Sequence, residues 1–201
     1  MHHHTVTLKT ATFIAASIIG SGVLIGAQGS QAPNATPPAP APRAVPPGQG
    51  DAKTGDHSFV TEAAMGGMAE VDLGRLASTQ AANDKVKAFG QRMVTDHGKA
   101  GDELKSLAAA KQITLPTSID AKHQAMHDKF AKLSGAEFDR AYVKDMLADH
   151  KKDVDAFTHE SMSGNDSDVK AWAAKTLPTL REHLRMIEDL DKELNSTRST
   201  R

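Results

Sequence analysis

The sequence predicts an all-α fold, an up-down-up-down four-helix bundle with a short extra helix in the middle connection. Three observations favour this fold. Apolar residues recur every three or four positions through residues 57–195, as in amphipathic helices. Seven of the nine prolines lie within residues 33–47, so helix breakers are rare elsewhere in the chain. No segment shows the two-residue alternation of a half-buried strand.

The N-terminal 27 residues predict a secretory signal peptide. Lys9 precedes an apolar run over residues 11–27, and small residues lie near the end of that run. We expect cleavage after Ala27, with an uncleaved N-terminal anchor as the alternative. The protein is therefore expected in the periplasm or the outer envelope. It would contact a membrane only through this segment, if the segment is not cleaved.

Residues 28–56 predict a Pro-rich disordered linker, because Pro/Ala-rich sequence favours extended, solvated backbone. The folded domain is expected over residues 57–195, followed by a tail at 196–201. Apolar spacing and cap residues then give each helix of the bundle in turn. The four long helices are expected at residues 58–80, 84–112, 134–162 and 167–194, with the short helix at 119–133.

Local signals mark the helix ends. Asn83 and Asp84 form a good cap pair before the second long helix. Pro116, within a Thr/Ser-containing segment, breaks the chain after that helix. Small residues on the apolar stripes are expected to let helices approach closely. These residues are Gly66, Gly67, Gly90 and Gly101.

Composition excludes several classes of function. The chain has 24 Lys and Arg against 25 Asp and Glu, which is not the basic excess of a nucleic-acid-binding protein. There is no Cys, which excludes disulfides, iron–sulfur clusters, Cys-ligated zinc and thiol catalysis. We find no nucleophile elbow, phosphate-binding loop or dinucleotide-binding motif. No nucleic-acid partner is expected, and any partner in the envelope is unknown.

Four polar residues interrupt the apolar stripes. His97 lies four residues after Met93, and His150 lies four residues after Met146. His183 falls between Leu180 and Ile187, and Glu70 falls between Gly66 and Leu73. Each long helix therefore directs one potential metal ligand into the bundle. Neutral imidazoles with one carboxylate suit zinc, iron, manganese or copper.

The predicted metal site is mononuclear, with three His and one Glu. The standard di-iron site of helical bundles needs a Glu three residues before a ligating His. Positions 94, 147 and 180 are Val, Leu and Leu, so that motif is missing. Second-tier candidates are Asp96 and Asp149, which precede their His residues, and Asp153, three residues after His150. The alternative is a purely structural polar core in which these groups satisfy one another.

The sequence also contains signs of a duplicated helical hairpin. Val86-Lys-Ala-Phe89 near the start of one helix matches Val169-Lys-Ala-Trp172 near the start of another. Met93-Val-Thr-Asp-His97 and Met146-Leu-Ala-Asp-His150 share a second local pattern. This internal similarity is suggestive of two related halves.

The folded region resembles a bacterial secreted family of unknown function that carries the label of an outer membrane protein. The segments that carry the resemblance are residues 67–74 (GMAEVDLG), 93–97 (MVTDH), 138–143 (FDRAYV), 146–150 (MLADH) and 177–184 (LPTLREHL). The resemblance implies a ferritin-like four-helix bundle and an exported location, with no settled activity. The family's motif residues fall on Glu70, Asp96, His97, Asp149, His150 and His183.

The leading functional hypothesis is the binding of a single transition metal ion, serving sequestration or protection of the envelope from stress. A non-enzymatic interaction module with a structural polar core is the first alternative. A metal-dependent redox enzyme acting on oxygen or peroxide is the second, and it predicts a solvent channel to the His cluster. The sequence favours a non-enzymatic role.

Overall fold

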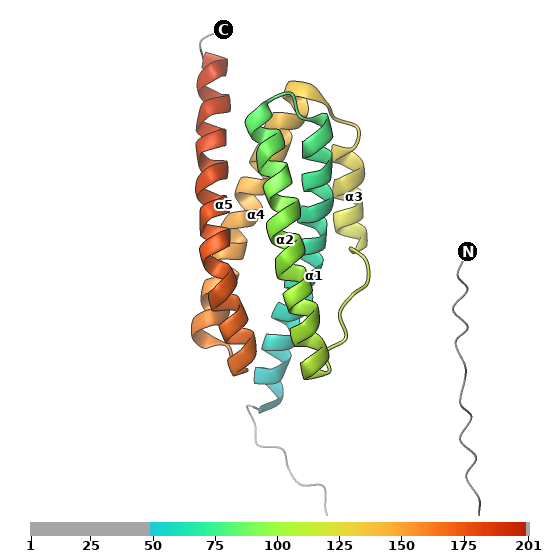
Figure 1. The fold of residues 1–201 in the computed structure, drawn as a ribbon, viewed down its shortest axis with the longest axis vertical. Coiled ribbons are helices and arrows are strands. Elements are labelled where there is room, and N and C mark those ends of the chain that lie inside the picture. The colour runs from blue at the N-terminus through green and yellow to red at the C-terminus, as the bar shows by residue number, and fades with distance from the viewer. Residues whose placement is uncertain (1–48, 200–201) are drawn as a thin grey trace, which may run out of the picture. The chain divides into compact units, whose positions relative to one another are not determined.

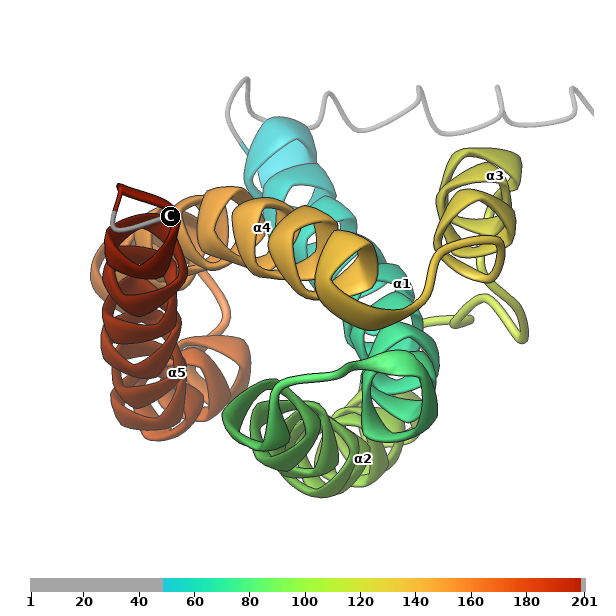
Figure 2. The ribbon, with the colours of Figure 1, turned by 90° about the horizontal axis from the view of Figure 1, so that it is seen from above.

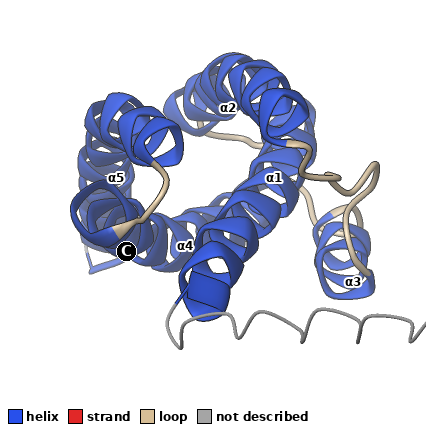
Figure 3. Ribbon diagram, turned by 90° about the horizontal axis from the view of Figure 1, so that it is seen from below, coloured by secondary structure: helices blue, strands red, loops and turns tan. Residues whose placement is uncertain are grey.

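Five α-helices account for most of the described part of the chain, residues 49–199 of a computed structural model. They are α1 (Gln49–Gln80), α2 (Asp84–Lys111), α3 (Ala121–Phe130), α4 (Gly135–Ser163) and α5 (Ser167–Ser199). No strand occurs within these residues (Figure 3). The prediction of an all-α, ferritin-like four-helix bundle with a short extra helix in the middle connection is confirmed. The predicted signal peptide and residues 28–48 of the predicted linker lie outside the described residues.

Helices α1 and α5 are longer than predicted. Helix α1 begins at Gln49, inside the predicted linker, because the last proline of the Pro-rich run is Pro47 and no helix breaker of that kind follows. Helix α5 continues to Ser199, inside the predicted tail. None of the helices in residues 49–199 is both long and apolar enough to cross a membrane.

The helix directions follow the order up-down-down-up, which corrects the expected up-down-up-down order. Lys85 at the start of α2 pairs with Glu193 near the end of α5, at 2.6 Å, so these helices are antiparallel. Helix α3 and its flanking loops carry the chain back along the bundle, and α4 then runs parallel to α2 (Figure 1). The extended middle connection causes the difference. One long crossover is the ferritin-like connectivity.

Viewed along its axis, the bundle places α1, α2, α5 and α4 around a common centre, with α3 outside them (Figure 2). The two hairpins, α1–α2 and α4–α5, clasp each other's turns. The Asp139 carboxylate of α4 accepts hydrogen bonds from the backbone N–H groups of Ala82 and Asn83, both at 3.0 Å. The Asp56 carboxylate of α1 accepts from the N–H groups of Asn165, at 3.1 Å, and Asp166, at 2.6 Å.

The two Asp residues show that the structure has an internal repeat. Asp139 lies 83 residues after Asp56, and the amides that they bind are separated by the same 83 positions. The same offset relates Val86-Lys-Ala-Phe89 to Val169-Lys-Ala-Trp172. Helices α1 and α4 are therefore equivalent, as are α2 and α5. The similarity between residues 93–97 and 146–150 pairs α2 with α4, so it does not follow this repeat.

The hydrophobic core has two parts, one near each end of the bundle. One cluster includes Phe89, Met93, Tyr142 and Ile187, and the other includes residues such as Leu104, Phe157, Trp172 and Leu180. All of these side chains are buried. The polar interruptions of the apolar stripes fall between the two clusters, so the bundle contains one polar layer near the middle of its length.

Two glycines let α1 and α2 approach closely. A Cβ atom on Gly74 would lie 2.7 Å from the carbonyl oxygen of Gly90, and one on Gly90 would lie 2.7 Å from that of Gly74. The expectation for Gly90 is thus confirmed, with Gly74 as its partner. The expectation is wrong for Gly66, Gly67 and Gly101, because nothing lies within 4 Å of a Cβ at these positions. They face open space instead.

Candidate metal centre

The four predicted ligands come together in the polar layer. Glu70 is on α1, His97 on α2, His150 on α4 and His183 on α5, and all four side chains are buried. Each lies one helical turn from an apolar core residue, which fixes its inward direction. His150 and His183 are fully inaccessible to solvent.

The three imidazole rings are mutual neighbours. The ring centroids of His97 and His183 are 5.3 Å apart, those of His150 and His183 are 5.4 Å apart, and those of His97 and His150 are 5.7 Å apart. One ring nitrogen from each residue lies within 4.8 Å of one from each of the others. Three helices thus deliver three rings to one point.

Each imidazole is held at one of its nitrogens by an oxygen atom. His97 Nδ1 lies 2.8 Å from a Glu70 oxygen, and His183 Nε2 lies 2.9 Å from an Asp96 oxygen. His150 Nδ1 lies 3.0 Å from the backbone carbonyl oxygen of Met146. A carbonyl or an ionised carboxylate can only accept, so these nitrogens carry the ring protons.

The opposite nitrogen of each ring is buried and has no hydrogen-bond partner within the described residues. These atoms are His97 Nε2, His150 Nε2 and His183 Nδ1. If the bonded nitrogens carry the protons, each of these three atoms carries a lone pair. Buried polar atoms are normally satisfied, and three unsatisfied ones on neighbouring rings require an explanation. A metal ion that accepts all three lone pairs is one.

Burial keeps the imidazoles in the neutral form that a metal requires. Burial lowers the pKa of His97 and of His150 below the usual value, and the negative charges around them only partly oppose it. For His183, burial is again the main cause, and its pKa falls to about 4 despite the hydrogen bond with Asp96. The cluster therefore offers neutral nitrogen donors at neutral pH.

A second group joins the first through His150. One oxygen each of Glu70 and Asp153 and one nitrogen of His150 all lie within 4.8 Å of one another. Glu70 Oε1 lies 3.6 Å from His150 Nδ1 and has no hydrogen-bond partner. Burial raises the pKa of Glu70 to about 7. Burial, together with the charge of Glu70, raises the pKa of Asp153.

The second-tier carboxylates separate into different environments. Asp96 bonds His183 and is also paired with Arg92. Burial opposes its ionisation, but the hydrogen bonds from Arg92 and His183 outweigh burial and lower its pKa. Asp153 lies next to Glu70, whereas Asp149 pairs with Lys152 of the same helix at 3.8 Å. Sequence patterns gave no sign of Arg92, because its role depends on a contact one turn away.

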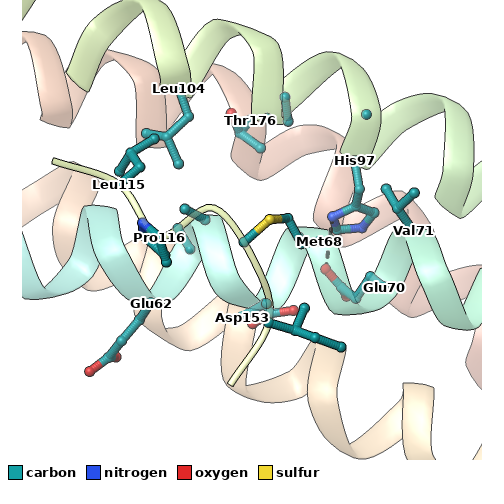
Figure 4. Close-up of a pocket in the computed structure, with 18 of the residues that line it drawn as sticks. Glu62, Met68, Glu70, Val71, His97, Leu104, Leu115, Pro116, Asp153 and Thr176 are labelled. Carbon is teal, nitrogen blue, oxygen red and sulfur yellow. Dashed lines mark ion pairs between the residues drawn. The ribbon is translucent and has the colours of Figure 1, made fainter. Parts of the chain in front are cut away.

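A cavity of about 790 Å³ reaches the polar layer. Glu70, His97 and Asp153 are among its lining residues, and His150 and His183 are not. Figure 4 shows Glu70 and His97 at one end of the cavity, with Leu115 and Pro116 of the middle connection toward the other. The sequence analysis anticipated a channel only as part of the redox-enzyme alternative. Its sequence signal is the set of helical glycines that line it, namely Gly66, Gly67, Gly98 and Gly101.

Comparison with known proteins supports the fold and a family. A family described as "Domain of unknown function (DUF4142)" matches residues 41–190. The crystal structure of a DUF305 fragment from Deinococcus radiodurans is similar, with a TM-score of 0.61 and 14% sequence identity. The alignment covers 76% of this chain and 99% of that one. No curated protein matches the chain.

Proposed function

This chain belongs to the DUF4142 family of domains of unknown function, and we propose that its bundle binds one transition metal ion through His97, His150 and His183. The carrying observation is that the three buried nitrogens without hydrogen-bond partners belong to three adjacent rings. Leaving a buried polar atom unsatisfied costs about 1–3 kcal/mol, so three such atoms are a substantial burden on a metal-free protein.

The oxygens that hold the opposite nitrogens have a recognisable role in this proposal. Metal-ligating imidazoles commonly donate their second N–H to a carboxylate or a backbone carbonyl, which fixes the ring and its protonated nitrogen. Glu70, Asp96 and the carbonyl of Met146 provide this for His97, His183 and His150, respectively. Glu70, expected as a fourth ligand, is thereby assigned the orientation of His97.

The proposed role is to hold a metal ion for sequestration or envelope protection. Imidazole nitrogen suits zinc, copper and iron(II), and does not select among them by chemistry alone. An exported location, in the periplasm or at the outer membrane, belongs to the proposal. It rests on the apolar run at residues 11–27 and on the sequence resemblance.

Metal content tests the proposal directly. The full chain would carry alanines at His2, His3 and His4, because this run binds metals itself. Elemental mass spectrometry after exposure to zinc, copper, manganese or iron(II) is expected to find about one equivalent of one ion. His97→Ala combined with His150→Ala should abolish it. The matched control is His123→Ala with His127→Ala, a partly exposed pair on α3 that should leave it unchanged.

Failure to bind any of these metals would overturn the proposal. The three imidazoles would then be a structural polar layer, and the alternative of a non-enzymatic interaction module would lead.

The cavity supports a second candidate function, a metal-dependent redox enzyme. The second sequence alternative requires access to the cluster, and the cavity extends to Glu70 and His97. The metal-loaded protein would be assayed for the consumption of hydrogen peroxide. Turnover that is lost in the His97→Ala, His150→Ala variant would support this candidate. Stoichiometric metal without turnover would eliminate it.

A further inference from the structure

The cavity beside the polar layer has the composition of a small-molecule binding site. Its volume of about 790 Å³ falls within the range of ligand pockets, and aromatic and aliphatic side chains make up much of its wall. Phe59, Phe157 and Trp172 belong to this wall and pack against one another, with the Phe59 and Phe157 ring centroids 4.9 Å apart. An apolar ligand body would find apolar contacts here.

The cations that line the cavity are already paired with neighbouring acids. Arg75 pairs with Asp72 at 3.4 Å, Lys105 with Asp102 at 3.0 Å, and Lys152 with Asp149 at 3.8 Å; all six residues line the cavity. These pairs cancel formally. The remaining acids of the described lining are Glu62, Glu70 and Asp153, and no Lys or Arg of the lining remains to balance them.

Glu70 points to a hydrogen-bond donor as the missing partner. The side chain is only 4% exposed, and its Oε1 has no hydrogen-bond partner within the described residues. The other oxygen is engaged by His97, and Asp153 adds a second carboxyl beside it. Figure 4 shows Glu70 and Asp153 at the cavity. An ammonium group carries three N–H donors, which suits two adjacent carboxyl groups.

We propose that this cavity binds a small organic cation, a primary amine with an apolar body, whose ammonium group lies between Glu70 and Asp153. The apolar body would lie along Phe59, Leu104 and Phe157. An anion of the same shape would be repelled by the two carboxyl groups. A neutral molecule would lack the positive charge that strengthens a hydrogen bond to a carboxylate. The site is independent of metal binding, because neither His150 nor His183 lines the cavity.

Three probes of equal chain length separate charge from apolar burial. Hexylamine, hexanol and hexanoate would be titrated into the full chain at pH 7.5 by isothermal titration calorimetry. Hexylamine is expected to bind at least about tenfold more tightly than hexanol, the difference that one charge-assisted hydrogen bond provides. Hexanoate is expected to bind more weakly than either. Equal affinity for hexylamine and hexanol would overturn the proposal.

Variants locate the bound amine. Asp153→Asn should weaken hexylamine binding by about tenfold or more and leave hexanol nearly unchanged. Gly101→Leu should block the cavity, because Gly101 lines it and has nothing within 4 Å of an added Cβ. The matched control is Gly55→Leu, a helical glycine outside the lining that also faces open space.

Two further arms keep the result interpretable. If Gly101→Leu does not fold, as judged by circular dichroism, Gly67→Leu replaces it, because Gly67 also lines the cavity with free space around it. The variant His150→Ala, His183→Ala should lose metal and keep hexylamine affinity, which separates this site from the proposed metal site. Unchanged hexylamine affinity in the folded Gly101→Leu or Gly67→Leu variant would overturn the proposal.

Discussion

An oxygen of Asp96 lies 2.9 Å from Nε2 of His183, although the two residues are on different helices and 87 positions apart in the sequence. The contact joins α2 to α5. With Asp96 ionised, it places the ring proton of His183 on Nε2 and leaves Nδ1 free inside the bundle. The neighbour of one histidine in the sequence, His97, thereby orients a different one in space.

Asp96→Asn should weaken metal binding about 10–100-fold, because an amide is a poorer acceptor than a carboxylate and no longer fixes the ring proton of His183. Competition against a chromophoric chelator measures the change. Asp102→Asn is the matched control, since Asp102 forms an exposed pair with Lys105 on the same helix. Equal affinities for Asp96→Asn and the wild type would count against the orienting role of Asp96.

His150→Leu should stabilise the metal-free protein and destabilise it relative to the metal-loaded wild type. His150 is fully buried, and its Nε2 has no hydrogen-bond partner, so a leucine removes an unsatisfied atom at similar volume. The gain in the free energy of unfolding is expected at about 1–3 kcal/mol. Urea unfolding with and without chelator gives both numbers. A loss of stability in the metal-free state would show that His150 is satisfied without metal.

Gly74→Ala should destabilise the bundle by about 1–3 kcal/mol, because the added methyl group meets the backbone of α2 at Gly90. A backbone atom cannot move aside as a flexible side chain can. Gly55→Ala is the matched control, because Gly55 is also helical and faces open space. There the gain in helix propensity, about 1 kcal/mol, should dominate. Urea unfolding midpoints of both variants test the contrast.

Glu160→Gln should raise stability at neutral pH, and the gain should shrink as the pH falls. Burial, and then the charge of Asp56, raise the pKa of Glu160 above its usual 4.5. A raised carboxyl pKa means that the folded state holds a proton which the unfolded state releases. The wild type therefore loses stability as pH rises from about 4.5 through the folded-state pKa.

The matching experiment compares unfolding free energies of the wild type and Glu160→Gln at pH 4, 5.5 and 7.5. Glutamine does not titrate, so the difference between the two proteins should widen steadily with pH. A difference that is constant across this range would mean that Glu160 ionises normally in the folded protein.

Helix positions were predictable from the sequence because local signals define them. The cap at Asn83 accepts the backbone N–H of Lys85 as expected, and α2 begins at Asp84. The inward direction of Glu70, His97, His150 and His183 followed from helical periodicity, since each lies one turn from a buried apolar residue.

The direction of α4 could not be predicted in the same way. It depends on the path of the middle connection, and the apolar stripes are compatible with either direction. The partners of the histidines were equally hidden, because pairs such as Asp96 and His183 form only once the helices are packed. The cavity was missed because Gly66, Gly67 and Gly101 were interpreted as points of close contact.

The reciprocal clasps of Asp56 and Asp139 make the chain a tethered dimer of two hairpins. Each hairpin carries both halves of the clasp, a carboxylate near the start of its first helix and a turn that receives its counterpart's. Glu70 and Asp153, also 83 residues apart, are equivalent positions that meet at the centre. Gene duplication and fusion leave this arithmetic. The histidines depart from it: Leu180 occupies the position equivalent to His97, so the nitrogen donors belong to the later divergence of the halves.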